Sequence, residues 1–219
     1  MSNLLTARRN MVENQIRANK VTDVSIIAAF NEIPREDFVP SGKEAVAYVD
    51  EDLSMGGGRY LMEPMVLARL LQEALIDSSD IVLDVGCCTG YSTAIISRLA
   101  TSVIGVDDSK DAIDSANDNL ARLEIDNAGV VLGSLRDGYA QQMPYTFIIV
   151  SGAVEEVPGP LFDQLSDGGR LATVLKKDEF DMGKATIFHK IKNEVSSRYL
   201  FDAGTPSLPG FFKQTVFHL

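Results

Sequence analysis

The sequence has no tryptophan, only two cysteines and two histidines, and fewer basic than acidic side chains, with 20 Lys and Arg against 31 Asp and Glu. The net charge of -11 works against binding of a nucleic-acid backbone, which depends on clustered basic side chains. No apolar run approaches the roughly 20 residues that span a bilayer, and the first ten residues lack the apolar core of a signal peptide. We expect a cytoplasmic protein without nucleic-acid or membrane partners.

The two cysteines, Cys87 and Cys88, are neighbours in the sequence. Neighbouring Cα atoms lie about 3.8 Å apart, below the usual disulfide range of roughly 4.4–6.8 Å, so a bond between them would be strained. His189 and His218 lie far along the chain, no zinc-ligand spacing appears, and we expect no metal. A thiol near a helix N-terminus can be reactive, but the favoured interpretation is that these small side chains permit close packing.

The first forty residues predict two short helices, which end near Pro34 and Pro40. A glycine-containing loop at residues 56–58 follows. A third helix is expected over residues 64–75, because Pro64 is tolerated in a first helical turn and apolar residues recur at helical spacing. At 219 residues and 45% apolar composition, the chain fits one globular domain over residues 1–219.

From residue 81 the chain alternates between apolar strands and amphipathic helices. This order is typical of a doubly wound α/β fold, in which a mostly parallel sheet carries helices on both faces. Ligands of such sheets bind beyond the carboxyl ends of the strands. The expected strands span 81–85, 102–107, 129–133, 146–150 and 170–175, and the expected helices span 92–99, 111–123 and 161–165.

A loop of sequence GCCTG follows the first of these strands. Gly86 and Gly90 can adopt backbone angles that other residues avoid, and the free N–H groups of the next helix point to the same crevice. Asp107 ends the next strand, 21 positions after Gly86, where an acid commonly holds the hydroxyl pair of an adenosine ribose. The loop, the acid and the strand order together favour an adenosine-containing cofactor over a simple packing turn.

The loop does not match the G-x-G-x-x-G pattern of dinucleotide sites, because its third position bears a side chain. NAD, and with it a reductase, is therefore disfavoured. S-adenosylmethionine has no phosphate and carries a sulfonium cation, for which Asp84 beside the loop would be electrostatically suitable. An equally weighted interpretation is that Asp84 only accepts hydrogen bonds from loop amides.

The run DVGCCTGYS at 84–92 resembles the first cofactor motif of the protein-L-isoaspartate O-methyltransferases, and residues 11–40 resemble that family's N-terminal helices. The resemblance covers roughly residues 7–175. It implies a Rossmann-like methyltransferase fold with an N-terminal helical extension and loop over 1–60, a cofactor-binding core over 61–175 and a C-terminal completion of the sheet over 176–219. The implied enzyme moves a methyl group from S-adenosylmethionine to the free α-carboxyl of an L-isoaspartyl residue in damaged proteins.

The resemblance also implies a set of cofactor-binding residues. Asp107 would hold the ribose. Cys88 stands where the family usually has glycine, and Ser134 and Leu135 follow Gly133 where the family has an acid and a second glycine, so weaker cofactor binding is expected. The full implied set is Asp84, Gly86, Cys87, Cys88, Thr89, Gly90, Asp107, Ser134 and Leu135.

A further departure concerns the active-site stretch, where the family's Thr-Ile-Ser-Gln-Pro is replaced by residues 60–64, YLMEP. Met62 stands in the place of the serine linked to catalysis, and a thioether cannot copy the hydrogen bonds of a hydroxyl. Arg59 can bind a carboxylate in bidentate fashion and Tyr60 offers another hydroxyl, so both are candidate catalytic residues.

Two hypotheses remain. The first is a working carboxyl methyltransferase acting on isoaspartyl proteins, and the second is a cofactor-binding relative with another methyl acceptor or none. The C-terminal part, residues 190–219, alternates as added sheet strands would. Its closing residues 211–219, FFKQTVFHL, fit either a cover for a sheet edge or an oligomer contact, so the oligomeric state stays open.

Overall fold

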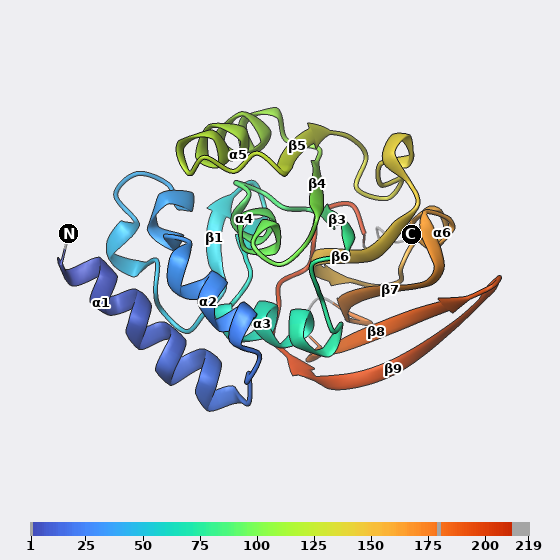
Figure 1. Cartoon of the computed structure of the whole chain (residues 1–219), viewed down its shortest axis with the longest axis horizontal. Coiled ribbons are helices and arrows are strands. Elements are labelled where there is room, and N and C mark those ends of the chain that lie inside the picture. Colours follow the sequence, from blue (N-terminus) through green and yellow to red (C-terminus); the bar gives the residue numbers. More distant parts are fainter. Residues whose placement is uncertain (1, 179–180, 212–219) are drawn as a thin grey trace, which may run out of the picture.

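The computed structural model of the chain describes residues 2–178 and 181–211. Within these residues, a seven-stranded sheet forms the centre of the molecule in the order β5-β4-β3-β6-β7-β8-β9 (Figure 1). The strands from β5 to β7 in that order pair in parallel, whereas β8 and β9 are added in antiparallel fashion. Their bounds are β3 Ile81–Val85, β4 Ser102–Asp107, β5 Ala128–Leu132, β6 Tyr145–Val154, β7 Leu165–Leu175, β8 Gly183–Ile191 and β9 Glu194–Ala203.

The predicted doubly wound α/β fold is confirmed. Strand β3 lies between β4, the next strand in sequence, and β6, which is reached only after β5 has been placed at the edge. This reversal of strand order creates a crevice at the carboxyl ends of β3, β4 and β6, which is where open α/β sheets bind their ligands.

The apolar run in β6 is explained by burial on both faces of the sheet. Successive side chains of a strand point to opposite faces. Phe147 and Ile149 pack in the core on one face, and Ile148 and Val150 pack in the core on the other. Both faces exclude water, so polar alternation is absent.

The two faces are covered unequally. The N-terminal helices share one core with α3 Pro64–Glu73, α4 Tyr91–Ser97 and α5 Lys110–Arg122. The other face is covered by the short helix α6 Gly159–Asp163 and by the segment that carries Leu208 and Phe211. The expected helix at 161–165 is therefore displaced, because Leu165 already begins β7.

The N-terminal extension contains the two expected helices. These are α1 Ser2–Met11, which continues through a π-turn and a 3-10 turn to Asn19, and α2 Val24–Glu32. The carboxylate of Asp23 caps α2 by accepting from the amides of Ser25 and Ile26. Short 3-10 turns at Arg35–Phe38 and Glu44–Val46 then lead to the hairpin. In Figure 1 the extension lies at one end of the sheet, and the β8–β9 hairpin projects at the other.

The glycine loop at 56–58 is the turn of a small antiparallel hairpin, made by β1 Leu53–Gly56 and β2 Arg59–Leu61. The turn was predicted, but its flanking strands were not. They are short and only half buried, so they lack the apolar pattern of the core strands. This hairpin carries the three candidate residues Arg59, Tyr60 and Met62 to the crevice.

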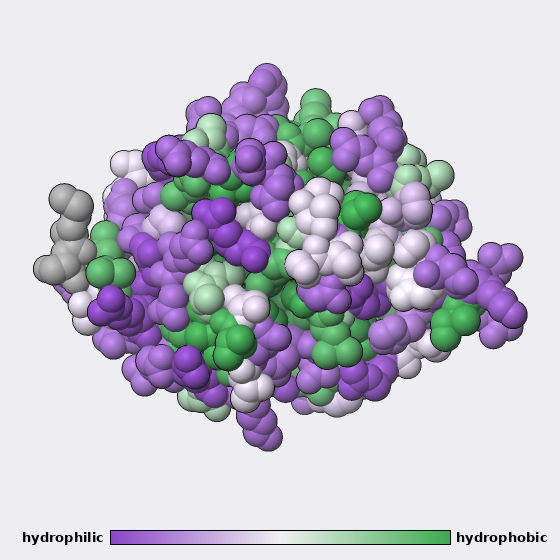
Figure 2. Space-filling model, in the orientation of Figure 1, coloured by the Kyte–Doolittle hydropathy of each residue, from purple (hydrophilic) through white to green (hydrophobic). Residues whose placement is uncertain are grey.

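The expected C-terminal strands are present as β8 and β9, although β8 begins upstream of residue 190. Residues 212–219, which include most of the closing FFKQTVFHL, lie outside the described residues. None of the helices within 2–178 and 181–211 is long and apolar enough to cross a bilayer. The face seen in Figure 2 is mostly hydrophilic, with apolar residues in several separate groups.

Candidate functional site

The loop between β3 and α4 begins with a glycine that has a left-handed backbone and lies close to another part of the chain. Gly86 has φ +78°, and a Cβ built on it would lie 2.8 Å from Cδ1 of Leu208. Leu208 is held beyond the end of β6, where its amide donates to the carbonyl of Ala153 at 2.8 Å. The C-terminal segment thus covers the first residue of the loop.

Cys88, in the middle of the same loop, has φ +51°, a left-handed conformation that costs a residue with a Cβ about 1–2 kcal/mol. The conformation is retained because its amide donates to Oδ2 of Asp107 at 3.0 Å. Burial raises the pKa of the Cys88 thiol to about 11 and raises that of Cys87 well above its usual value. Both cysteines are free and buried, which agrees with the packing interpretation over the reactive one.

Asp84 is fully buried at the end of β3, and its partners are hydroxyl groups. Its Oδ2 accepts from Ser92 Oγ at 2.6 Å and Thr93 Oγ1 at 2.8 Å, and its Oδ1 accepts from Ser151 Oγ at 2.7 Å. Burial raises its pKa, while the three hydroxyls oppose that rise. Asp84 therefore ties the ends of β3, α4 and β6 together through hydroxyl groups, whereas one interpretation of the sequence had loop amides as its partners.

Asp107 ends β4 and lies at the same edge of the sheet as the loop. Besides the Cys88 amide, its carboxylate accepts from the amide of Ser109 at 3.0 Å. Its side chain is only 1% exposed. The predicted meeting of the glycine-containing loop and this acid is therefore observed.

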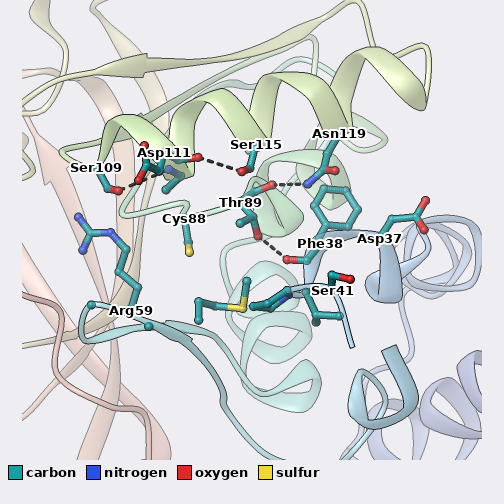
Figure 3. A pocket seen from close by; sticks show the side chains of 16 residues that line it. Asp37, Phe38, Ser41, Arg59, Cys88, Thr89, Ser109, Asp111, Ser115 and Asn119 are labelled. Atoms are coloured by element: carbon teal, nitrogen blue, oxygen red, sulfur yellow. Dashed lines mark hydrogen bonds between the residues drawn. The ribbon is translucent and has the colours of Figure 1, made fainter. Parts of the chain in front are cut away.

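Arg59 of the hairpin reaches the same carboxylate. Its Nε donates to Asp107 Oδ1 at 3.0 Å and its Nη2 lies 2.9 Å from that oxygen, while the guanidinium also contacts Asp108. Its side chain is 11% exposed. In Figure 3 the Arg59 side chain rises at one edge of the pocket, with Cys88 beside it. In this structure Arg59 is paired with acids of the protein, whereas the sequence analysis expected it to be available for a substrate carboxylate.

A cavity of about 710 Å³ lies on one side of Arg59, between α5 and the N-terminal segment (Figure 3). Thr89 donates its hydroxyl to the carbonyl of Phe38 at 2.6 Å, and Asn119 donates to the carbonyl of Thr89 at 3.1 Å. These bonds fasten the glycine-containing loop to both walls of the cavity.

A second cavity, of about 490 Å³, lies beside Asp108 and beyond the end of β5. Ser134 and Leu135, which the resemblance assigns to the cofactor, line it together with Leu132 and residues 209 and 210 of the C-terminal segment. Leu135 is buried, so the cavity has an apolar floor with a hydroxyl at its edge. This combination suits a flat heteroaromatic ring.

Met62 follows β2 and is 6% exposed. Two cavities of about 10 Å³, each large enough for about one water molecule, adjoin it, and Tyr60 and Ser151 line both. Leu208 lines one of them. The positions implied by the resemblance therefore do meet at the carboxyl ends of β3 and β6, in a closed and tightly packed arrangement.

Arg35 is a part of this site that the sequence analysis missed. It is completely buried, donates through Nε to the carbonyl of Ala47 at 2.9 Å and through Nη2 to the carbonyl of Met62 at 3.1 Å, and lies 4.8 Å from the centre of the Tyr91 ring. It fixes the backbone of the active-site stretch. Its role is invisible in the sequence, because most arginines lie at the surface.

Two acids next to Met62 were also missed. The amide of Glu63 donates to Oδ1 of Asp52 at 2.9 Å. Partial burial, followed by the nearby charges of Asp50 and Asp52, raises the pKa of Glu63 to about 7. The site therefore contains a carboxyl group that titrates near neutral pH, which no spacing in the sequence indicates.

The family is decided by comparison with known proteins. A family model described as Protein-L-isoaspartate(D-aspartate) O-methyltransferase (PCMT) matches residues 6–200. The chain belongs to this family. The relative from Methanoculleus marisnigri that is named protein-L-isoaspartate O-methyltransferase is 42% identical over 164 residues, which make up 75% of this chain and 74% of the relative.

Solved structures agree with the family assignment. A structure titled protein-L-isoaspartate O-methyltransferase superposes with a TM-score of 0.82 at 29% identity, covering 93% of this chain and 66% of that one, slightly under two thirds. A Plasmodium falciparum protein described as a putative family member, solved in complex with S-adenosyl-L-homocysteine, superposes with a TM-score of 0.76 at 20% identity over 92% of this chain and 97% of its own. The latter likeness concerns the fold alone.

The structure shows the surroundings of two residues at which the sequence departs from the family pattern, Met62 and Cys88. Met62, in place of the family serine, is enclosed rather than presented on an open surface. Cys88, in place of the family glycine, keeps the left-handed backbone that glycine adopts without strain.

Proposed function

We propose that this protein is an S-adenosylmethionine-dependent methyltransferase that esterifies the free α-carboxyl of L-isoaspartyl residues in proteins and peptides. The observation that carries the proposal is the convergence of the glycine-containing loop, Asp107 and the hairpin residue Met62 on one crevice, within a chain that matches the family over residues 6–200. The comparisons do not favour the second hypothesis, a relative with another acceptor or none.

The residues present fit the adenosine half of the cofactor. The carboxylate of Asp107 suits a pair of ribose hydroxyls. Its Oδ2 accepts from the Cys88 amide, and a carboxylate oxygen has capacity for a second hydrogen bond. The cavity of about 490 Å³ at Ser134 and Leu135 adjoins Asp108 and would take the adenine ring. A hydroxyl at Ser134 is a weaker acceptor than the family acid, so we expect reduced affinity rather than loss of binding.

The methionine half would lie towards Gly86, where the lack of a side chain permits close approach to the backbone. When bound, S-adenosylmethionine supplies an activated methyl group on a sulfonium centre. Asp84, with three hydroxyl partners, keeps the ends of β3, α4 and β6 at fixed separations beneath this region. We assign Cys87, Thr89 and Gly90 to the support of the loop.

Methyl transfer to a carboxylate needs little general acid or base catalysis from the protein. A carboxylate is already nucleophilic at neutral pH, so alignment of its oxygen with the methyl carbon provides much of the acceleration. With the donor bound, transfer would form the C–O bond as the S–C bond breaks, and would leave a methyl ester and a neutral thioether. Tyr60 lines both cavities around Met62, and we assign its hydroxyl to positioning the substrate carboxylate, because the other hydroxyl shared by both cavities, that of Ser151, donates to Asp84.

Three further assignments belong to the proposal. The protein acts in the cytoplasm on isoaspartyl-containing proteins. Residues 1–219 act as one domain, in which residues 1–60 and 176–219 complete the core at 61–175. Arg35 is a positioning residue for the stretch that contains Met62, because it holds the carbonyl of that residue from within the core.

The test is transfer of a labelled methyl group to a peptide with one L-isoaspartyl residue, beside the same peptide with a normal aspartyl linkage. Incorporation is expected only into the first peptide, and the label should be released as methanol when the ester collapses to the succinimide. Binding of S-adenosylhomocysteine is measured separately by calorimetry. Cofactor binding without isoaspartyl-dependent incorporation would overturn the proposed acceptor.

A further inference from the structure

The ribose subsite of this protein contains a competitor from its own chain. Oδ1 of Asp107 has three nitrogen neighbours at hydrogen-bonding distance, namely Arg59 Nε at 3.0 Å, Arg59 Nη2 at 2.9 Å and the Ser109 amide at 3.0 Å. A carboxylate offers about four lone pairs over its two oxygens. Oδ1 is therefore saturated, and only Oδ2 can accept a further bond.

A ribose diol donates two hydroxyl protons, and its usual recognition by an acid at this position engages the carboxylate in both bonds. With Arg59 in place, only one such bond can form. The guanidinium also lies against the carboxylate from the side of the hairpin, and in Figure 3 the Arg59 side chain stands at one edge of the pocket. The arginine and the diol cannot be bound to Oδ1 together.

Arg59 has a second acid available. Its Nη2 also contacts Oδ1 of Asp108, whose side chain is 50% exposed while that of Asp107 is 1% exposed. Arg59 follows a turn in which Gly57 and Gly58 both have positive φ, so a change of backbone angles there meets little steric resistance. An outward movement of the guanidinium releases Asp107 while the ion pair with Asp108 is kept.

We propose that Arg59 competes with the ribose of the cofactor for Asp107 and that cofactor binding transfers the guanidinium to Asp108 alone. Arg59 thereby lowers the affinity for the cofactor and stabilises the free protein. This inference rests on the proposed function only through the adenosine cofactor, and it does not depend on the methyl acceptor. The proposal also explains why Arg59 forms ion pairs with both Asp107 and Asp108 in the crevice where the cofactor would bind.

Two other roles for Arg59 predict different effects of its removal on cofactor affinity and on stability. If Arg59 donated directly to a bound cofactor, its removal would weaken binding. If Arg59 only braces the hairpin, its removal would lower stability and leave the affinity unchanged. Competition alone predicts a less stable free protein that binds the ligand more tightly.

The experiment is calorimetric titration of the full chain with S-adenosylhomocysteine for the natural protein and for Arg59→Gln, Arg59→Lys and Arg98→Gln. Arg98 is a matched control, because it forms an ion pair at 3.0 Å with Glu32, outside the crevice. We expect Arg59→Gln to tighten the Kd about tenfold, since a displaced charged hydrogen bond no longer opposes binding. Arg59→Lys, which keeps the charge but loses the fork, should fall between, and Arg98→Gln should match the natural protein.

Thermal unfolding of the same proteins measures their stability independently of the titration. Arg59→Gln should lower the Tm of the free protein and show a larger rise in Tm at a fixed ligand concentration. Weaker or unchanged binding by Arg59→Gln, with the natural protein binding normally, overturns the competition and leaves the proposed function intact. Absence of binding by every variant overturns the competition together with the cofactor assignment. Arg59→Lys keeps the test decisive if Arg59→Gln does not fold.

Discussion

The backbone amide of Cys88 donates to Oδ2 of Asp107 at 3.0 Å, so a residue in the left-handed conformation is joined to the acid at the end of the neighbouring strand. The amide is independent of the side chain. The hydrogen bond to Asp107 therefore does not depend on which side chain stands at position 88, although that side chain must be small because it is buried.

For Cys88→Gly, relief of about 1–2 kcal/mol of left-handed strain should offset the loss of a buried thiol, which leaves stability within about 1 kcal/mol of the natural protein. Cys88→Val should lose at least about 2 kcal/mol, because a β-branched residue is strongly disfavoured at positive φ. Urea denaturation measures both. Equal stability of the valine variant would show that position 88 does not adopt this conformation in solution.

Replacement of Asp107 by alanine should weaken binding of S-adenosylhomocysteine by at least about tenfold, since each hydrogen bond to a charged group contributes roughly 1.5–3 kcal/mol. The amides of Cys88 and Ser109 also lose their acceptor, so a lower Tm is expected. Calorimetry gives the affinity. An unchanged Kd would remove Asp107 from the cofactor site.

Met62→Ser should raise turnover on an isoaspartyl peptide about ten- to a hundredfold, because a hydrogen bond formed chiefly in the transition state acts on kcat. Since Met62 is 6% exposed, the smaller side chain should also cost about 2–4 kcal/mol of stability. Met62→Ala is the matched control, because it opens a similar cavity without supplying a hydroxyl. Equal turnover in the serine and alanine variants would show that the hydroxyl has no role here.

The pKa of Glu63, about 7 in the folded protein against an ordinary 4.5, determines the direction in which stability changes with pH. The folded state holds the proton more tightly than the unfolded state, so this group makes stability fall as the pH rises from about 4.5 to about 7, with no further change above. Glu63→Gln should flatten that part of the profile and leave a protein that is more stable than the natural one at pH 8. The exposed Glu51→Gln serves as control, and denaturation midpoints across this range provide the measurement. A slope retained in Glu63→Gln would assign the effect to another group.

The core of the fold was predictable because its signals are local. The strands that became β3, β4 and β6 are apolar runs bounded by turns, and helices begin where Pro64 and the loop after Val85 indicate. The hairpin strands β1 and β2 were missed because their short, half-exposed segments carry no periodicity. The helix at 161–165 was misplaced by two residues because the apolar residues Leu161 and Leu165 suit a helix and a strand equally well.

The site was predictable from the sequence only where segments that are close along the chain form it. The loop and Asp107 belong to adjacent strands, so their meeting follows from the order of strands. Arg35 and Leu208 were not identified because they reach the crevice from distant segments, and the packing that brings them there is decided by the whole core. The pairing of Arg59 with Asp107 was missed for the same reason. An arginine can pair with any acid in the sequence, and only the tertiary structure decides which acid lies close to it.

The position of Leu208 against Gly86 has a consequence for biosynthesis. During translation, β3, the glycine-containing loop and β4 leave the ribosome well before the segment that closes over them. Until Leu208 docks beyond Ala153, the nascent protein presents Gly86 and the carboxyl end of β6 to water. The crevice therefore matures late in synthesis, because the segment that covers Gly86 is made after β3, β4 and β6.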